Sequence, residues 1–265
     1  MGKKIGFIGA GNMAEALISG IIKSGVSVKN ILVSDINSQR LNYISKKYKV
    51  KKSSGNAETV KSSDIVFLAI KPYQVEEVLK EVGILFNNKK LLVSIAAGIT
   101  TTKIEKYLRN IPVIRSMPNT PALLGYGAIA ITKGKFAKTS DLRIAEKLLF
   151  SCGVVVTVSE KDMDAVTAVS GSGPAYVFYV AEVMRKTAVK LGLSNVVAKI
   201  LVDMTLLGAS SMLITSEDEP EVLRQRVTSK GGTTEAAFKV LSNKKFGDIF
   251  EKAIVTAKNR SKEMS

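Results

Sequence analysis

A glycine-rich turn near the start of the chain has the residue types and spacing of a dinucleotide-binding loop. Gly9-Ala10-Gly11-Asn12-Met13-Ala14 follows an apolar run expected to form a strand and opens an expected helix. Gly9 permits a tight turn, Gly11 lets the backbone approach a pyrophosphate, and the small Ala14 allows the helix to pack closely on the strand. Backbone N–H groups at the start of such a helix face phosphate oxygens. The turn therefore predicts binding of a nicotinamide dinucleotide; the alternative is a turn that uses glycine only for geometry.

The residues that end the second expected strand bear on which dinucleotide is bound. Asp35 stands where a carboxylate bonds the ribose hydroxyls of NAD and repels a 2′-phosphate. Ser34, Asn37 and Arg40 are close to it in the chain and could still receive the phosphate of NADP. Asp35 could also be a loop residue or a helix cap. The sequence is therefore divided between NADH and NADPH.

One residue type is missing, and its absence limits the reaction that the dinucleotide could serve. The 265 residues include no histidine and a single cysteine, Cys152, which we expect to be a packing residue. Cysteine and histidine metal clusters are thereby excluded, and no metal site is predicted. Carbonyl reductases often need a histidine to protonate the nascent alkoxide. Hydride transfer here must use another acid or a substrate that needs little acid assistance.

Composition indicates an ordinary folded protein. Hydrophobic residues make up 46% and charged residues 23% of the chain. The net charge of +16 comes from lysine and arginine spread along the sequence, and aromatic residues make up only 6%, so no nucleic-acid-binding face is predicted. The first residues lack the apolar stretch of a secretory signal. The longest apolar run, residues 200–214, is too short to span a bilayer and carries Asp203. We expect a cytoplasmic protein that binds neither nucleic acid nor membrane.

The elements that must position these residues fall into two parts. The first alternates short β-rich runs with helical patterns, which is typical of a parallel α/β sheet. Its expected strands are residues 4–8, 31–34, 50–52, 65–69, 91–95, 113–116, 128–132 and 154–158, with helices over 12–24 and from near 38. Only helical patterns follow, over residues 160–168, 175–191, 194–214, 220–226, 234–241 and 246–262. We expect an α/β dinucleotide-binding domain over 1–159 and an all-α domain over 160–265.

Two of the later helices are apolar on almost every face. Residues 175–181 read Ala-Tyr-Val-Phe-Tyr-Val-Ala, and residues 200–214 are nearly as apolar. Such helices must be buried on all sides, and the remaining helices offer limited interior for two of them. A partner subunit that completes the core is the simplest solution, so we expect a homodimer. A single larger bundle is the alternative.

Further segments resemble the pyrroline-5-carboxylate reductase family. In the family's order they are Ala69-Ile70-Lys71-Pro72, Ser94-Ile95-Ala96-Ala97-Gly98, Arg115-Ser116-Met117-Pro118-Asn119-Thr120-Pro121, residues 164–176 and residues 227–234. The resemblance spans essentially the whole chain, and its last two segments are far more specific than the glycine turn. It implies a Rossmann-type N-terminal domain, a helical dimerisation domain and a site between them. It also implies reduction of 1-pyrroline-5-carboxylate to L-proline by NADPH or NADH, the final step of proline biosynthesis; assembly of dimers into larger oligomers is left open.

The resemblance further implies roles for single residues. Thr167 matches a threonine beside the substrate nitrogen and is the expected catalytic residue. Asn56 would lie near the adenosine end of the dinucleotide, and Asn119 and Thr120 near the nicotinamide. The expected cofactor residues are Gly9, Ala10, Gly11, Asn12, Met13, Ser34, Asp35, Asn37, Asn56, Ala69, Ile70, Lys71, Pro72, Ala96, Ala97, Asn119 and Thr120. The expected substrate residues are Glu160 and Glu217 near the ring, and Ser229, Gly231, Gly232, Thr233 and Thr234 in the carboxylate loop.

Two positions depart from the family. Lys230 stands where proline is often found, and Asp35 stands where NADPH-preferring members often carry a small or basic residue. Taken without the resemblance, Gly231 and Gly232 before a helix start indicate either an anion-binding nest or a flexible turn. The segment 170–174 could likewise be only an interhelical loop.

A cyclic imine suits a reductase without histidine. If the ring enters as the iminium, it already carries the proton and charge that make its carbon electrophilic, and the protein mainly aligns two rings. The rivals are a reductase of a hydroxy acid or another imine that uses a lysine acid such as Lys71, and a non-catalytic nucleotide-sensing or nucleic-acid-binding protein on the same scaffold.

Overall fold

The computed structural model describes residues 2–264, which form two compact units. The sheet unit contains the chain up to Pro174 together with the residues from Thr256 onward. The helical unit contains Ala175–Val255. The chain therefore leaves the sheet unit after Pro174 and returns to it at Thr256, so the sheet unit is built from two separate pieces of sequence.

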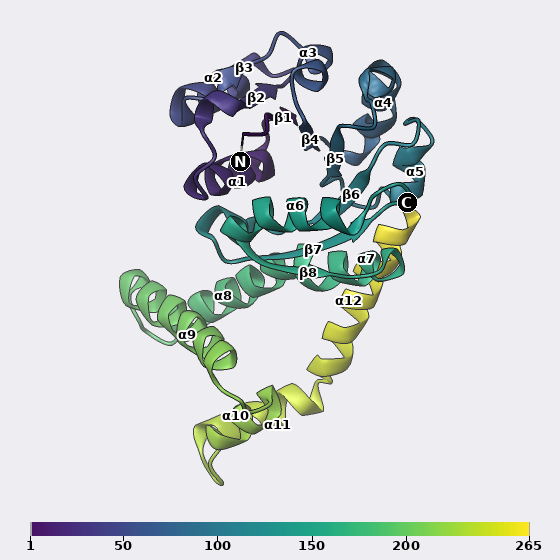
Figure 1. The fold of residues 1–265 in the computed structure, drawn as a ribbon. Helices are drawn as coiled ribbons and strands as arrows, with labels where there is room; N and C mark the ends of the chain where they lie inside the picture. Colours follow the sequence, from purple (N-terminus) through teal and green to yellow (C-terminus); the bar gives the residue numbers. More distant parts are fainter. Residues whose placement is uncertain (1, 265) are drawn as a thin grey trace. The chain divides into compact units, whose positions relative to one another are not determined.

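An eight-stranded sheet forms the centre of the sheet unit (Figure 1). Its strands are β1 (Ile5–Ile8), β2 (Ile31–Ser34), β3 (Lys51–Lys52), β4 (Ile65–Leu68), β5 (Leu91–Ser94), β6 (Val113–Met117), β7 (Gly127–Lys133) and β8 (Gly153–Thr157). They lie in the order β3-β2-β1-β4-β5-β6-β7-β8. Neighbours from β3 to β6 are parallel, β7 is antiparallel to β6, and β8 is parallel to β7. Every expected strand is present, and each end agrees to within one residue.

Helices cover both faces of this sheet, as the apolar strands require. The helices of the sheet unit are α1 (Asn12–Lys23), α2 (Ser38–Tyr48), α3 (Asn56–Lys61), α4 (Val75–Val82), α5 (Thr101–Glu105), α6 (Thr139–Leu149) and α7 (Met163–Val166). Phe7 of β1 belongs to a core shared with α1, α2 and α6, and its ring stacks on Phe67 at 4.7 Å. The next residue, Ile8, belongs to a second core shared with α3, α4 and α5. Because side chains alternate along a strand, a strand buried on both faces must be apolar throughout, as β1 and β4 are.

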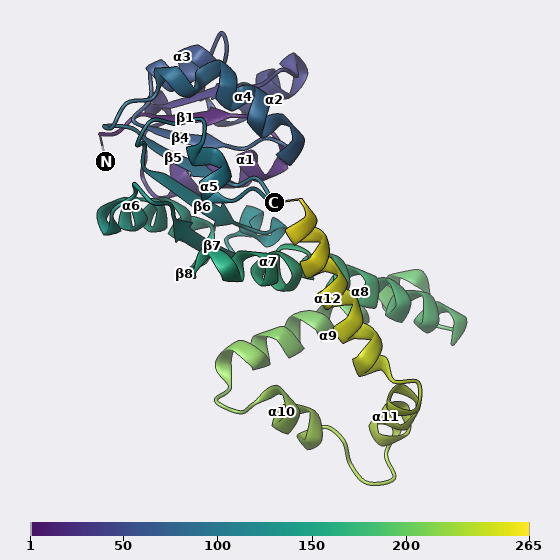
Figure 2. The ribbon, with the colours of Figure 1, turned by 90° about the vertical axis from the view of Figure 1, so that its right-hand side faces the viewer.

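The helical unit consists of helices alone (Figure 2). It holds most of α8 (Gly173–Lys190), then α9 (Asn195–Thr215), α10 (Pro220–Arg226), α11 (Thr233–Asn243) and the first part of α12 (Phe246–Glu263). These agree with the helices expected from the sequence. Arg185 of α8 and Lys199 of α9 both pair with Asp203 of α9, which ties these two helices together.

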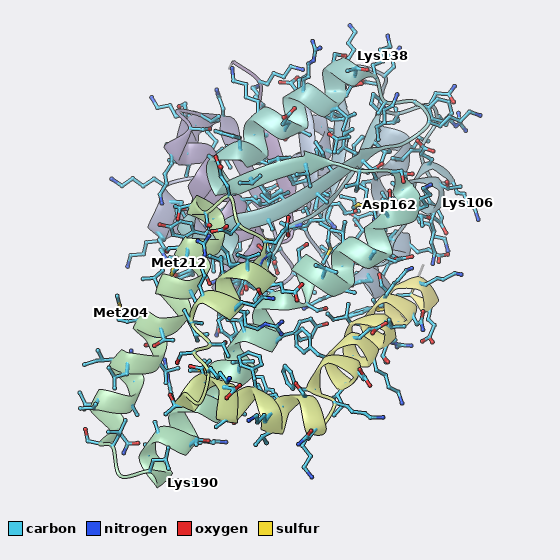
Figure 3. The ribbon with its side chains drawn as sticks, turned by 90° about the horizontal axis from the view of Figure 1, so that it is seen from below. Lys106, Lys138, Asp162, Lys190, Met204 and Met212 are labelled. Carbon is cyan, nitrogen blue, oxygen red and sulfur yellow. The ribbon has the colours of Figure 1, made fainter. Side chains whose placement is uncertain are left out.

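The apolar surfaces of α8 and α9 are exposed in the single chain. Phe178 is 65% exposed, and Met204 and Met212, both labelled in Figure 3, are 59% and 53% exposed. The apolar run at residues 200–214 lies inside a longer helix, because α9 spans 21 residues and contains an 18-residue stretch with a mean hydropathy of 1.7. The argument that this segment is too short for a bilayer is therefore wrong: α9 could cross one by length and composition. Contiguous apolar surface of this size needs a covering partner.

One buried carboxylate joins the first two helices of the sheet unit. Glu15 of α1 is 7% exposed and accepts hydrogen bonds from side chains of α2. The donors are Arg40, Lys47 at 2.9 Å, Tyr48 at 3.0 Å and Tyr43 at 3.3 Å. Burial by itself raises the pKa of Glu15, but the hydrogen bonds from Lys47, Arg40 and Tyr48 outweigh it and lower the pKa to about 2. The α1–α2 contact therefore depends on a charged Glu15.

We predict that this contact is lost in acid. In the unfolded chain Glu15 protonates near pH 4.5, whereas in the folded chain it stays charged to about pH 2. Its stabilisation is complete above the unfolded value and disappears as pH falls from 4.5 to 2. This lowering of the Glu15 pKa corresponds to about 3 kcal/mol of folding stability near neutral pH. Denaturant unfolding should show that Glu15→Gln lowers the free energy of unfolding near neutral pH by roughly this amount and flattens its acid dependence. Tyr43→Phe, which removes the longest of the four bonds to Glu15 together with the bond that Lys47 donates to the Tyr43 hydroxyl, is the control; equal effects of the two variants would contradict the assignment.

Candidate active site

A cleft of about 630 Å³ opens at the carboxyl ends of β1 and β4 in the sheet unit. β2 lies on one side of β1 and β4 on the other, so the strand order reverses between them. Ligands of parallel α/β sheets bind at such a switch point. The cleft brings together these sequence-predicted cofactor residues: Gly9, Gly11, Asn12, Met13, Asp35, Asn37, Asn56, Ala69, Ile70, Lys71, Pro72, Ala97 and Thr120.

Four of the expected cofactor residues do not line the cleft but are buried behind it. They are Ala10, Ser34, Ala96 and Asn119. The Ser34 hydroxyl donates to Asn56 Oδ1 at 2.9 Å, and so acts behind a lining residue. The Asn119 side chain donates to Ser170 O at 3.0 Å and accepts from the N–H of Ala128 at 3.0 Å. Asn119 therefore ties the end of β6 to β7 and to the segment after α7.

Two glycines give the cleft its shape. Gly9 has φ of +101°, and a Cβ there would lie 2.3 Å from the carbonyl oxygen of Ala69. Only glycine lets the turn after β1 approach the end of β4 so closely. Gly11 caps the start of α1, and a Cβ there would meet no atom within 4 Å. The open space at Gly11 leaves room for the pyrophosphate that the sequence predicts at this helix N-terminus.

The turn after β2 is held by its own carboxylate. Asp35 accepts from the N–H of Ala10 at 2.6 Å and from the N–H of Asn37 at 2.7 Å. The side chain of Asn37 caps α2 by accepting from the N–H of Arg40 at 3.0 Å. Asp35 is thus a loop-organising residue that also lines the cleft, and its contact with a ribose stays a prediction.

The cleft also contains residues that sequence reasoning missed. Ile36 is 89% exposed and Tyr73 is 82% exposed, and both line the cleft with Gln74. An exposed isoleucine beside a cleft suits the face of an adenine ring. The sequence does not mark these residues because an isolated apolar residue in a turn is usually without function.

Thr167 occupies an irregular turn of helix in the sheet unit. The expected helix over residues 160–168 is instead a 3-10 turn (Glu160–Asp162), α7 and a π-helical turn (Thr167–Gly171). The π turn is closed by the N–H of Ser172 donating to Thr167 O at 2.8 Å. Such turns are rare and frequent at functional sites. The Thr167 hydroxyl donates to Met163 O at 2.8 Å, so its proton is committed and its lone pairs remain as acceptors.

Glu160 is engaged by neighbours within the sheet unit. One oxygen pairs with Arg115 at 2.5 Å, and the other accepts from the hydroxyl of Thr101 at 2.7 Å and from its N–H at 3.3 Å. Arg115 is 2% exposed, and its second terminal nitrogen is buried without a hydrogen-bond partner. Glu160 therefore neutralises a buried cation and joins β6 and α5 to the start of the segment that carries Thr167.

The other expected substrate residues belong to the helical unit. Glu217 is exposed between α9 and α10, and Ser229, Gly231, Gly232, Thr233 and Thr234 surround the start of α11. The N–H of Gly231 donates to the carboxylate of Glu235 at 2.8 Å. The first intrahelical bond of α11 runs from Ala236 to Gly232. The N–H groups of the first turn, at residues 233–235, therefore precede the intrahelical bonding pattern and face the helix N-terminus.

The parallel sheet with its glycine turn, switch-point cleft and covering helices defines a dinucleotide-dependent oxidoreductase of the Rossmann type. A family model described as NADP oxidoreductase coenzyme F420-dependent matches residues 4–98, and one described as pyrroline-5-carboxylate reductase dimerisation matches residues 160–264. Pyrroline-5-carboxylate reductase 1 of Bacillus spizizenii is 40% identical over 266 residues, which cover 99% of this chain and 90% of that protein. The chain belongs to the pyrroline-5-carboxylate reductase family.

Solved structures agree with this membership. A pyrroline-5-carboxylate reductase from Coxiella burnetii superposes with a TM-score of 0.90 at 38% identity, covering 99% of this chain and 98% of that one. The pyrroline carboxylate reductase of Plasmodium falciparum, crystallised with NADP bound, gives a TM-score of 0.91 at 31% identity with the same coverage. The expected fold class is thereby confirmed.

We predict that Gly9→Ala damages both the fold and dinucleotide binding. The new methyl group would collide with the Ala69 carbonyl on a backbone that disfavours side chains. The strain should lower the free energy of unfolding by about 1–3 kcal/mol, and relief of the strain should close the cleft. Gly25→Ala is the matched control, because Gly25 has φ of +92° but open space around it. Titration with NADH, followed by its fluorescence, should show normal binding for Gly25→Ala only; normal binding by both variants would refute the role of Gly9.

Proposed function

We propose that this chain reduces 1-pyrroline-5-carboxylate to L-proline with NAD(P)H, as the final step of proline biosynthesis. The observation that carries the proposal is full-length similarity to proteins named for this activity, including those of Bacillus spizizenii and Pseudomonas aeruginosa at 40% identity. The cleft of the sheet unit fits the cofactor, with the turn at Gly9–Gly11 for the pyrophosphate, Asp35 and Asn56 for the adenosine ribose, and Thr120 toward the nicotinamide. When bound, NAD(P)H supplies the hydride.

Thr167 is the residue we assign to the substrate nitrogen. Its hydroxyl proton is donated to Met163 O, so the oxygen can accept an N–H bond. An iminium ring has such an N–H group, whereas a neutral imine does not. Thr167 would therefore orient the ring in the protonated form whose carbon accepts hydride, and no histidine is required. The π turn sets the direction of the backbone around residues 167–171, and it thereby fixes the position of this hydroxyl.

The two acidic residues receive different roles. Both carboxylate oxygens of Glu160 are already occupied, so we assign it to holding the segment before Thr167 in place rather than to direct contact with the ring. Glu217 is exposed and remains our candidate for the negative charge that favours the iminium.

The substrate carboxylate is assigned to the start of α11. The Gly231 N–H is taken by Glu235, so the donors offered to a ligand are the N–H groups of the first turn and the hydroxyls of Ser229 and Thr234. The positive end of the α11 dipole favours an anion there. A Cβ at Gly232 would lie 2.5 Å from Ser229 Oγ and 3.0 Å from Ser229 O, so a larger residue there would displace the Ser229 side chain.

We propose that the chain acts as a cytoplasmic homodimer that binds neither nucleic acid nor membrane; dimers could assemble further. Support comes from the exposed apolar faces of α8 and α9, which lie in the segment matched by the dimerisation family. Asp203 lies within α9 and pairs with Arg185 and Lys199, a charged cluster that would be costly in a bilayer. Lysines such as Lys106 and Lys138 are scattered over the surface of the sheet unit, which favours no single nucleic-acid face (Figure 3).

The activity is tested by proline oxidation at alkaline pH. Purified protein should reduce NAD or NADP in the presence of L-proline, and should consume NADH or NADPH with pyrroline-5-carboxylate. Absorbance of the reduced nicotinamide reports both directions. A folded protein that turns over neither substrate, but oxidises a 3-hydroxy acid, would replace the proposal with the rival reductase.

We predict that Thr234→Ala weakens use of the carboxylate-bearing substrate. Loss of one hydrogen bond to a charged group is worth about 1.5–3 kcal/mol, or roughly ten- to a hundredfold in kcat/KM. Reduction of 1-pyrroline, which has the ring but lacks the carboxylate, should change little. Thr205→Ala is the control, because that hydroxyl only bonds the carbonyl of Leu201 within α9. Equal damage to both substrates would show that Thr234 serves the helix start or the ring instead.

A further inference from the structure

The guanidinium of Arg40 is held behind the adenosine end of the cleft. Its Nε donates to Ala10 O at 2.7 Å, and one terminal nitrogen donates to Asn12 Oδ1 at 3.3 Å and pairs with Glu15. The guanidinium also lies 5.0 Å from the ring centre of Tyr43. Protein acceptors therefore hold this cation on the glycine turn, and Arg40 does not line the cleft.

Asp35 and Arg40 bind the two backbone polar groups of one residue of the turn, Ala10. Asp35 accepts from the Ala10 N–H, while Arg40 donates to the Ala10 carbonyl. Asp35 faces the cleft, so the carboxylate and not the guanidinium is presented to the ribose. Among the other residues expected to receive a 2′-phosphate, Ser34 is 2% exposed and bonded to Asn56, and only Asn37 lines the cleft.

Glu15 decides where the Arg40 side chain points. Its carboxylate is almost buried and is the charged partner of Arg40, while Lys47 and Tyr48 bind the other oxygen and keep the group in place. A charge-assisted bond of this kind is about twice as strong as a neutral one. Without Glu15, the terminal nitrogens of Arg40 would lose their charged partner and could turn toward a phosphate placed beside Asp35.

We infer that Glu15 is a specificity-determining residue: by holding Arg40 on the glycine turn it makes the chain favour NADH over NADPH. This inference rests on the proposed function only because the two cofactors compared, NADH and NADPH, are those of the proposed reaction. Glu15 does not line the cleft and acts through Arg40, so it is a positioning residue. The wild-type protein should use NADH with a kcat/KM about tenfold or more above that for NADPH, because Asp35 repels the 2′-phosphate and no cation offsets it.

The experiment compares Glu15→Gln, Glu15→Met and Arg40→Met, with Lys47→Met as a matched control that breaks an ion pair to Glu15 but leaves Arg40 held. Releasing Arg40 in the Glu15 variants should raise the NADPH to NADH ratio of kcat/KM by about tenfold, and Glu15→Met offers Arg40 only a weak, uncharged thioether acceptor. Arg40→Met should weaken both cofactors equally, since the contacts that it loses to Ala10, Asn12 and Glu15 hold the glycine turn in place for either dinucleotide. Lys47→Met should leave the ratio unchanged.

Calorimetry with 2′,5′-ADP and 5′-AMP provides a readout that needs no turnover. The Glu15 variants should gain affinity for 2′,5′-ADP alone, and the gain should vanish when Arg40→Met is added. A selective loss of NADPH use, or of affinity for 2′,5′-ADP, in the Arg40→Met variant alone would show that Arg40 already binds the phosphate and would overturn the inference. So would an unchanged ratio in both Glu15 variants, or a wild type that prefers NADPH. If the nucleotides behave as expected but proline is not oxidised, the proposed reaction fails while the inference about Glu15 stands.

Discussion

The contact between Gly9 and the carbonyl of Ala69 is the constraint on which the cofactor cleft depends. It brings the carboxyl ends of β1 and β4 together at the point where the strand order reverses. The turn after β1 and the turn after β4 separate beyond this contact. Both neighbouring strands are apolar on both faces, so helices must cover each side and the open carboxyl edge is the place left for a ligand. The ladder repeats the same register on both sides of β1, because Ile8 is level with Ser34 and with Leu68. Asp35 and Ala69 consequently begin their turns at the same height as Gly9.

Acidic residues are scarce in this basic chain, with 23 against 39 lysines and arginines. Several of them hold neighbouring elements or turns in place through hydrogen bonds and ion pairs. Glu15 fastens α2 to α1, Glu160 neutralises a buried Arg115, and Glu235 binds the turn at Gly231. Each of these carboxylates is used for structure, and the chain contains no histidine. A substrate that brings its own proton suits this arrangement, and the Thr167 hydroxyl, whose proton is donated to Met163 O, can serve such a substrate as an acceptor.

The sheet was predictable to within a residue because strand positions depend on local apolar runs and glycine turns. The cleft residues of the first turn were predictable for the same reason. The hydrogen-bond partners of single side chains were not predictable. Glu160 was expected near the substrate, but its pairing with Arg115 depends on how β6 and α5 pack, and the sequence spacing does not reveal this packing. Arg40 was expected to be open to a phosphate, yet Glu15, 25 residues away in sequence, holds it. Resemblance supplied the expected substrate residues of the helical unit, where local patterns alone left a nest or a plain turn.

The return of the chain to the sheet unit at Thr256 has a consequence for synthesis on the ribosome. Ser261 is 1% exposed and donates to Asp164 at 2.8 Å, and Met264 packs against Gly98. These contacts close only after residues 175–255 have been made, so the dinucleotide-binding part emerges first but is finished last. Because domains usually fold in order of emergence, the nascent sheet must persist with an uncovered flank while the apolar helices follow it out of the exit tunnel. Chaperone demand should therefore peak late in translation, when both kinds of exposed surface coexist.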